Sequence, residues 1–151
     1  MKNLLIISCI LFMTHCFSQT GKVITTLDYA NNEIMVPENC MAKSKFELLD
    51  CNGFSVQWEH LSNDNFKSAT RRWFKEFSKD CKSKTPIEVS SFGAVLKGYM
   101  FRYNNPDSQN RLIVYGTVSK QPLILNVASE DELVSFSSSN TFLNKLIVVP
   151  K

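Results

Sequence analysis

The residues best suited to chemistry are three cysteines, Cys40, Cys51 and Cys81, and the histidine His60. A cysteine beside a histidine can act as a nucleophile, and closely spaced pairs such as C-x₂-C or H-x₃-H bind zinc. No such pair occurs after residue 18, and the glycines form no phosphate-binding loop, so we expect no metal and no cofactor. If the chain is exported, its three cysteines after residue 18 also predict one disulfide and one remaining thiol.

A thiol-dependent or His-dependent hydrolase would need a nucleophile within hydrogen-bond reach of His60. The dipeptide Asn52-Gly53 predicts a two-residue hairpin turn, and along that hairpin His60 lies about 20 Å from Cys51. Pairing of His60 with Cys40 or Cys81 remains open, and no G-x-S-x-G motif supplies a serine. We therefore expect no catalytic residues and keep the small hydrolase as an alternative.

An amphipathic helix over residues 64–81 is the clearest element of the sequence. Ser62-Asn63-Asp64 supplies capping side chains, and Pro86 keeps the helix from continuing. The apolar side of the helix consists of Phe66, Ala69, Thr70, Trp73, Phe74, Phe77 and Cys81. A second helical segment is expected over residues 130–147, where a capping box opens it, although 141–149 is equally compatible with a strand.

Most other segments alternate apolar and polar residues, which is typical of strands. The predicted strands are 23–29, 34–36, 46–51, 54–61, 87–92, 94–103, 111–118 and 123–127. Short connections between the later strands indicate an antiparallel sheet of about five to seven strands with helices packed on it. The predicted fold class is therefore α+β.

The same elements predict which cysteines pair. A helix of about 17 residues covers about 25 Å, nearly the length of the preceding strand, so its end is expected beside the Asn52-Gly53 turn. Cys81 would then lie over the strand end that carries Cys51. We predict a Cys51–Cys81 disulfide, with Cys40 left as a free or intermolecular thiol.

Aromatic residues gather on one face of the predicted pair of strands 94–103 and 111–118. Symmetric closure of the loop between these strands would pair Tyr99 with Tyr115. The candidate binding face consists of Tyr99, Phe101, Tyr103 and Tyr115, with Lys97 and Arg111 at its edge. Tyrosine hydroxyls need a hydrogen-bond partner, which favours a ligand site, and the alternative is an aromatic core beneath a helix.

The exposed side of the predicted helix is basic. The candidate residues on it are Lys67, Arg71, Arg72, Lys75 and Lys79. A solvated helix face explains such a pattern, and attraction to an acidic polymer, anionic lipid or acidic partner is the alternative. The whole chain carries a net charge of only +3, and no aromatic residues interleave with this face, so we expect no nucleic-acid partner.

Residues 1–18 are predicted to be a signal peptide. Lys2 precedes an apolar run, and Cys16-Phe17-Ser18 offers small residues for cleavage before residue 19. That run is too short to span a bilayer, and no later segment qualifies. We expect a secreted or periplasmic protein with one domain over residues 19–151 and no transmembrane segment. A lipid anchor at Cys16 is the alternative.

The run VLKGYMFRYNN…RLIVYGTVSKQPLILNVASEDEL contains two long strands and a third that leads into an acidic helix start. This order of elements resembles small exported domains of the PsbP-like or DcrB-like kind over roughly 40 residues, which implies a fold and no site residue. We interpret the chain as an exported, non-enzymatic binding or accessory protein of the cell envelope, with a protein or a small envelope ligand as partner. An inhibitor or immunity-type protein that blocks another protein is a further alternative.

Overall fold

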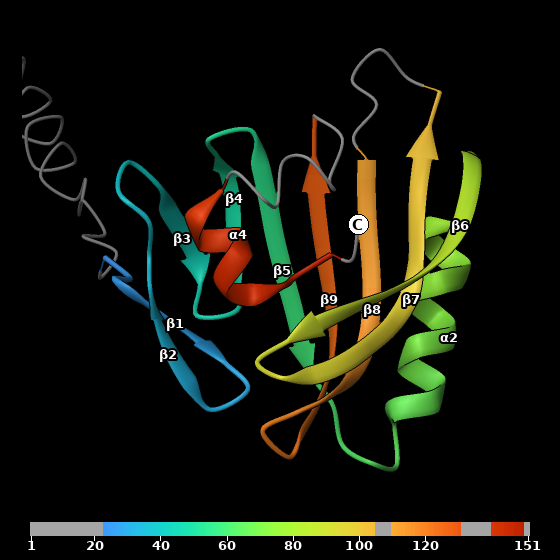
Figure 1. Cartoon of the computed structure of the whole chain (residues 1–151), viewed down its shortest axis with the longest axis horizontal. Coiled ribbons are helices and arrows are strands. Elements are labelled where there is room, and N and C mark those ends of the chain that lie inside the picture. Colours follow the sequence, from blue (N-terminus) through green and yellow to red (C-terminus); the bar gives the residue numbers. More distant parts are fainter. Residues whose placement is uncertain (1–22, 105–109, 131–139, 150–151) are drawn as a thin grey trace, which may run out of the picture.

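The computed structural model describes residues 23–104, 110–130 and 140–149, which form two antiparallel sheets and two helices (Figure 1). The small sheet pairs β1 (Thr26–Tyr29) with β2 (Asn32–Met35). The seven-stranded sheet has the order β3-β4-β5-β9-β8-β7-β6. Its strands are β3 (Met41–Ser44), β4 (Glu47–Cys51), β5 (Phe54–His60), β6 (Cys81–Ser91), β7 (Ala94–Tyr103), β8 (Asn110–Val118) and β9 (Gln121–Ser129). The helices are α2 (Phe66–Phe77) and α4 (Thr141–Leu146), and the predicted α+β class is confirmed.

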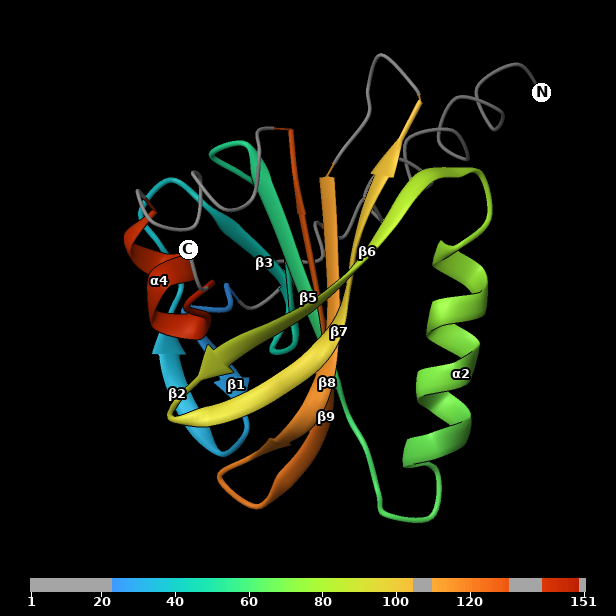
Figure 2. The same ribbon diagram turned by 45° about the vertical axis from the view of Figure 1, so that its right-hand side comes forward.

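Each face of the large sheet is covered by a different set of elements (Figure 2). Helix α2 packs over β7, β8 and β9, and this side is called the α2 face. Its buried core consists of Leu61, Ala69, Trp73, Phe101, Ile113 and Ile124. The β1–β2 hairpin and α4 cover the opposite side, the α4 face, where Leu27, Phe54 and Leu143 join a larger core. Alternation along β8 separates the two cores, because Leu112 and Val114 belong to the α4 face.

Tyr29 holds the β1–β2 hairpin against the α4 face. Its side chain is fully buried, its ring packs edge-on against Trp58 at 5.2 Å between centroids, and its hydroxyl lies 2.9 Å from Ser91 Oγ. Burial raises the pKa of Tyr29 to about 12, because the phenolate would lose its hydration.

We expect the free energy of unfolding to fall by about 2 kcal/mol through Tyr29 as the pH rises from about 10 to about 12. The unfolded phenol releases its proton near the lower value and the folded one near the upper value, so alkali favours the unfolded state in this window. Urea unfolding of the protein and of Tyr29→Phe across the window checks this. An equally steep pH dependence in Tyr29→Phe would show that another group is responsible.

The single long helix over residues 64–81 is wrong, because α2 ends at Phe77. Asp80 adopts a positive φ of 59°, and β6 begins at Cys81, which pairs with Tyr103. The backbone from Cys81 onward therefore bonds to the neighbouring strand β7. Phe77 and Cys81 are four residues apart, as two neighbours on one face of a helix are, but only Phe77 belongs to α2.

The C-terminal segment contains both of the structures that the sequence left open. Asn140 caps α4 by accepting hydrogen bonds from the backbone N–H groups of Phe142 and Leu143. After the helix, Val148 forms an isolated antiparallel bridge with Ser90. The rest of the predicted segment, residues 131–139, lies outside the described residues, as does the predicted signal peptide with Cys16.

The hairpin turn at Asn52-Gly53 is confirmed, since both residues have positive φ values, of 52° and 84°. The register of β7 and β8 differs from the predicted one by two residues: Tyr99 pairs with Ile113, and Tyr115 pairs with Lys97. A Cβ atom added at Gly98 would meet the backbone of Ile113, so this close approach requires glycine. A shift of two residues keeps every side chain on its predicted face.

The predicted Cys51–Cys81 disulfide is wrong. Cys51 is bonded to Cys40, with 5.0 Å between their Cα atoms, and Cys81 is a free thiol. The reason is the face on which the helix packs: Cys51 lies on the α4 face, whereas α2 covers the opposite side. A contact identifies the side of β5 that faces α2, because Trp73 Nε1 in the helix donates a 2.9 Å hydrogen bond to Glu59 in the strand.

Candidate binding groove

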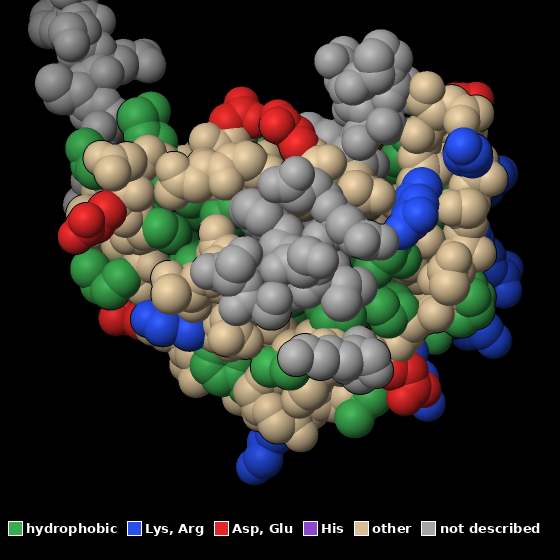
Figure 3. Space-filling view, turned by 45° about the horizontal axis from the view of Figure 1, so that its top comes forward, with side chains coloured by type: hydrophobic (Ala, Val, Ile, Leu, Met, Phe, Trp, Pro, Cys, Tyr) green, Lys and Arg blue, Asp and Glu red, His purple; other side chains and the backbone are tan. Residues whose placement is uncertain are grey.

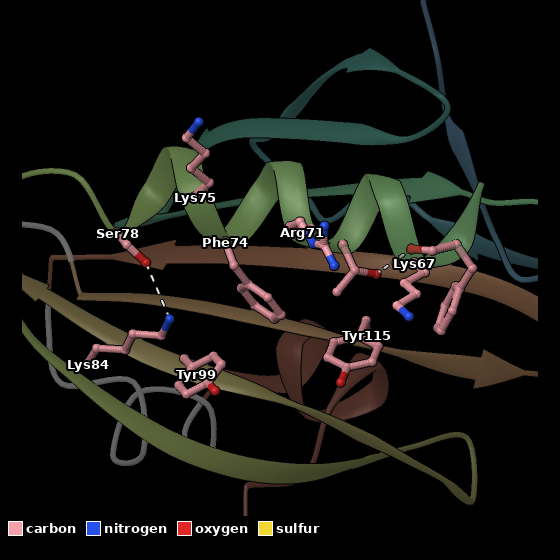
Figure 4. Close-up of a pocket in the computed structure, with 10 residues that line it drawn as sticks. Lys67, Arg71, Phe74, Lys75, Ser78, Lys84, Tyr99 and Tyr115 are labelled. Atoms are coloured by element: carbon pink, nitrogen blue, oxygen red, sulfur yellow. Dashed lines mark hydrogen bonds between the residues drawn. The ribbon is translucent and has the colours of Figure 1, made fainter.

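A groove runs between α2 and the strands β6, β7 and β8 (Figure 4). Its volume is about 690 Å³, within the range that holds small organic ligands. The lining residues are Phe66, Lys67, Thr70, Arg71, Phe74, Lys75, Ser78, Lys84, Tyr99 and Tyr115. We call this site the α2 groove. A smaller hollow of about 320 Å³ shares Tyr99 and Tyr115 with it and extends to Glu88 and Lys97.

The periodicities of the helix and the strands place these residues on one site. Phe66, Thr70 and Phe74 follow one another at intervals of four, so they form one stripe along α2. Tyr99 and Tyr115 are each the sixth residue of their strands, β7 and β8, and both lie on the α2 face opposite that stripe.

Aromatic rings line the interior of the α2 groove. The ring of Phe74 stands edge-on to Tyr99 at 5.1 Å and packs against Tyr115 at 5.6 Å between centroids. Phe66 also contacts Tyr115, with 5.6 Å between ring centroids. Such edge-to-face pairs hold rings in defined orientations, so the apolar wall is preformed.

In the described part of the chain, the hydroxyls of two tyrosines that line the groove have no hydrogen-bond partner. The hydroxyl of Tyr103 donates a 2.7 Å hydrogen bond to the carbonyl of Phe77. Among the described residues, no hydrogen bond engages the hydroxyl of Tyr99 or Tyr115, and Figure 4 shows both hydroxyls on the side away from α2. These two groups are therefore available to water or to a ligand.

Cations surround the rings. Lys84 Nζ lies 4.0 Å from the ring centroid of Tyr99 and 3.4 Å from Ser78 Oγ, at one end of the groove. Lys67 and Arg71 lie along the rim, and Figure 4 shows Lys75 pointing away from the strands. Figure 3 shows Lys and Arg side chains gathered along one side of the molecule.

These groove cations have no acidic partners in the described part of the chain. Neither Lys67, Arg71 nor Lys84 forms an ion pair there, and no Asp or Glu lines the α2 groove. Arg72, on the adjoining side of the helix, does pair with Glu59 at 3.5 Å. The α2 groove therefore carries positive charge that the described residues leave uncompensated.

The structure divides the predicted aromatic face. Tyr99 and Tyr115 line the α2 groove, whereas Phe101 is fully buried beneath the helix. Tyr103 and Arg111 lie at the end of α2, where the guanidinium of Arg111 is 4.8 Å from the ring centroid of Phe77 and donates to Asn126. Burial lowers the pKa of Arg111.

The remaining predicted residues are also divided. Lys97 lies in the smaller hollow and forms a 2.9 Å ion pair with Glu88. Of the basic helix residues, Lys67, Arg71 and Lys75 line the α2 groove, and Lys79 follows the end of the helix. Phe66, Phe74 and Lys84 were not predicted as site residues. An irregularity of β6 between Cys81 and Ser83 shifts the register, so Lys84 lies opposite Phe101 on the α2 face, where strict alternation from Cys81 would not have placed it.

His60 has a structural partner in the described residues. Its Nε2 atom accepts a 3.1 Å hydrogen bond from the backbone N–H of Ala30, in the β1–β2 turn. Across neighbouring strands, His60 lies level with Gly116, and Cys81 lies beyond the level of Arg111. Five residues of β8 separate these levels, an offset of about 17 Å.

Neither a metal site nor a membrane-spanning helix is found in the described residues. They contain no group of three His, Cys, Asp or Glu side chains arranged to hold a metal ion. No described helix is long and apolar enough to cross a membrane. No protein-family model, curated protein or solved structure matches the chain. What the fold and the site define is thus an antiparallel α+β protein with an aromatic, cationic groove.

Proposed function

We propose that the chain is an exported, non-enzymatic binding or accessory protein of the cell envelope that takes a small ligand into the α2 groove. One observation carries this proposal: a preformed aromatic wall meets three cations, Lys67, Arg71 and Lys84. Among the described residues, neither these cations nor the hydroxyls of the two groove tyrosines have an ion-pair or hydrogen-bond partner other than Ser78, which contacts Lys84. Apolar pockets with a few convergent polar groups are the usual form of ligand sites.

Two features support export to the envelope or beyond. The Cys40–Cys51 disulfide is typical of proteins in oxidising compartments. The pattern of residues 1–18 is typical of a signal peptide that is cleaved during export. A secreted or periplasmic protein is the interpretation that accounts for both.

The contacts of His60 and the cysteines favour binding over catalysis. In a hydrolase His60 would need a free nitrogen lone pair to act as a base, and the lone pair of its Nε2 atom already accepts the hydrogen bond from Ala30. The sulfurs of Cys40 and Cys51 are bonded to each other, and Cys81 is distant along the sheet. An inhibitor or immunity-type protein would act through a broad surface and would not need the groove.

A thermal-shift screen of small anionic, neutral and cationic compounds tests the proposal. A ligand at about ten times its Kd should raise the unfolding temperature by about 4 °C. The same compound should not stabilise Tyr99→Leu/Tyr115→Leu, which keeps apolar side chains against Phe74 but loses the rings and hydroxyls.

Stabilisation of this double variant as strong as that of the natural protein would contradict the proposal, and so would a screen without any stabilising compound. Turnover of a bound compound that disappears in His60→Gln would instead support the hydrolase alternative.

A further inference from the structure

The α2 groove also indicates what kind of ligand it takes. Resting on the proposed function, we infer that the ligand is an amphiphilic organic anion. Its flat apolar body lies against Phe74 and Tyr115, and its carboxylate or phosphate is held by Lys67 and Arg71.

The aromatic wall selects the body of the ligand. Phe66, Phe74 and Tyr115 present ring faces and edges at centroid separations of 5.6 Å, a spacing that a further ring can extend by stacking or edge contact. At the opposite end, Lys84 Nζ lies over the face of Tyr99 and closes the row of rings with a cation. A flat ring system therefore finds contacts along the groove.

The row of cations on α2 selects the charged group. Lys67 and Arg71 are four residues apart, so they are neighbours on the helix surface, and like charges at this spacing destabilise a helix. The first turn of α2 contains no acidic residue, and no ion pair in the described chain relieves the repulsion. A bound anion would remove this repulsion, and the guanidinium of Arg71 suits a carboxylate or phosphate because it can donate two parallel hydrogen bonds.

The charge of the groove also disfavours cationic and neutral ligands. No Asp or Glu among the described residues lines the groove, so a cationic ligand would meet only like charge from this lining. A neutral aromatic compound would leave Lys67 and Arg71 uncompensated. The charge of the site thus distinguishes an anion from an otherwise identical neutral compound.

Isothermal titration with the matched pair naphthylacetate and naphthylacetamide tests the inference, because the two probes differ in charge and share the same ring system. The full-length protein should bind the acid about tenfold more tightly than the amide. In Lys67→Gln/Arg71→Gln, affinity for the acid should fall to that for the amide, and affinity for the amide should not change. Lys79→Gln, which lies outside the lining, is the control and should bind both probes like the natural protein.

The outcomes separate the two proposals. Equal affinity for acid and amide, both lost in Tyr99→Leu/Tyr115→Leu, would overturn the anionic ligand and retain the groove as a binding site. Failure to bind either probe, or binding that this tyrosine variant does not weaken, would overturn the site as well. Lys67→Gln/Arg71→Gln should unfold at the same or a higher temperature than the natural protein, because it removes repulsion, so lost binding is not lost folding.

Discussion

Replacing Phe101 by alanine should lower the free energy of unfolding by about 3–5 kcal/mol. The ring is 0% exposed and belongs to the α2-face core, together with Trp73, Ile113 and Ile124. Its removal leaves a cavity beneath α2 that neighbouring strand residues cannot fill, so the lost packing adds to the lost burial. Equilibrium unfolding in urea measures the effect.

The matched variants are Tyr99→Ala and Tyr115→Ala, because these side chains lie on the same face but are only partly buried. Each should cost about 1–2 kcal/mol, since a ring at the edge of the groove loses fewer contacts than a ring in the core. If both variants were destabilised as much as Phe101→Ala, the tyrosines would be core residues and the α2 groove would not be a site.

Loss of the Cys40–Cys51 disulfide should lower the free energy of unfolding by about 3 kcal/mol in Cys40→Ser/Cys51→Ser. The bond closes a loop between cysteines 11 positions apart, and removing it frees the unfolded chain. Cys81→Ser is the control, because Cys81 is a free, partly exposed thiol whose one described hydrogen bond goes to the carbonyl of Ser78.

Thiol alkylation followed by peptide mass analysis checks the pairing itself. The unreduced protein should be alkylated at Cys81 and should yield a peptide that links Cys40 to Cys51. A peptide linking Cys51 to Cys81 would show that the helix packs on the other face of the sheet.

Alternation along the strands made the faces of the sheet predictable. Tyr99 and Tyr115 share a face in the predicted register and in every register that differs from it by an even number of residues. The turn at Asn52-Gly53 was predictable because few dipeptides adopt two positive φ values so readily. Short edge strand β3 was missed, because only the small side chain of Ala42 packs against the core and no clear apolar alternation marks the strand.

The side on which the helix packs was not predictable from one strand. In β5, Val56 and Trp58 form the apolar side of the strand, and this side faces the β1–β2 hairpin and α4. Glu59, on the polar side of the strand, meets α2 through Trp73 and Arg72. An amphipathic helix fits either face of a sheet that is covered on both sides, and this ambiguity led to the wrong disulfide.

The two candidate surfaces were predictable separately but not as one site. Lys67 and Arg71 come from the helix, and Tyr99 and Tyr115 come from strands far along the chain. Their meeting depends on the strand order, which places β7 and β8 beneath α2, and on the early end of the helix, which brings Lys84 into a strand. Neither the strand order nor the position at which the helix ends can be predicted from sequence periodicity.

The assignment of the α2 groove as the binding site is tested most directly by proton–nitrogen NMR. The experiment records the backbone amide signals while naphthylacetate is added to the protein. We expect the largest shifts at Phe66, Arg71 and Phe74 in α2 and at Tyr99 and Tyr115 in the facing strands, all saturating with one dissociation constant. Shifts concentrated elsewhere, such as around His60 and the β1–β2 turn, would contradict the assignment of the α2 groove as the binding site.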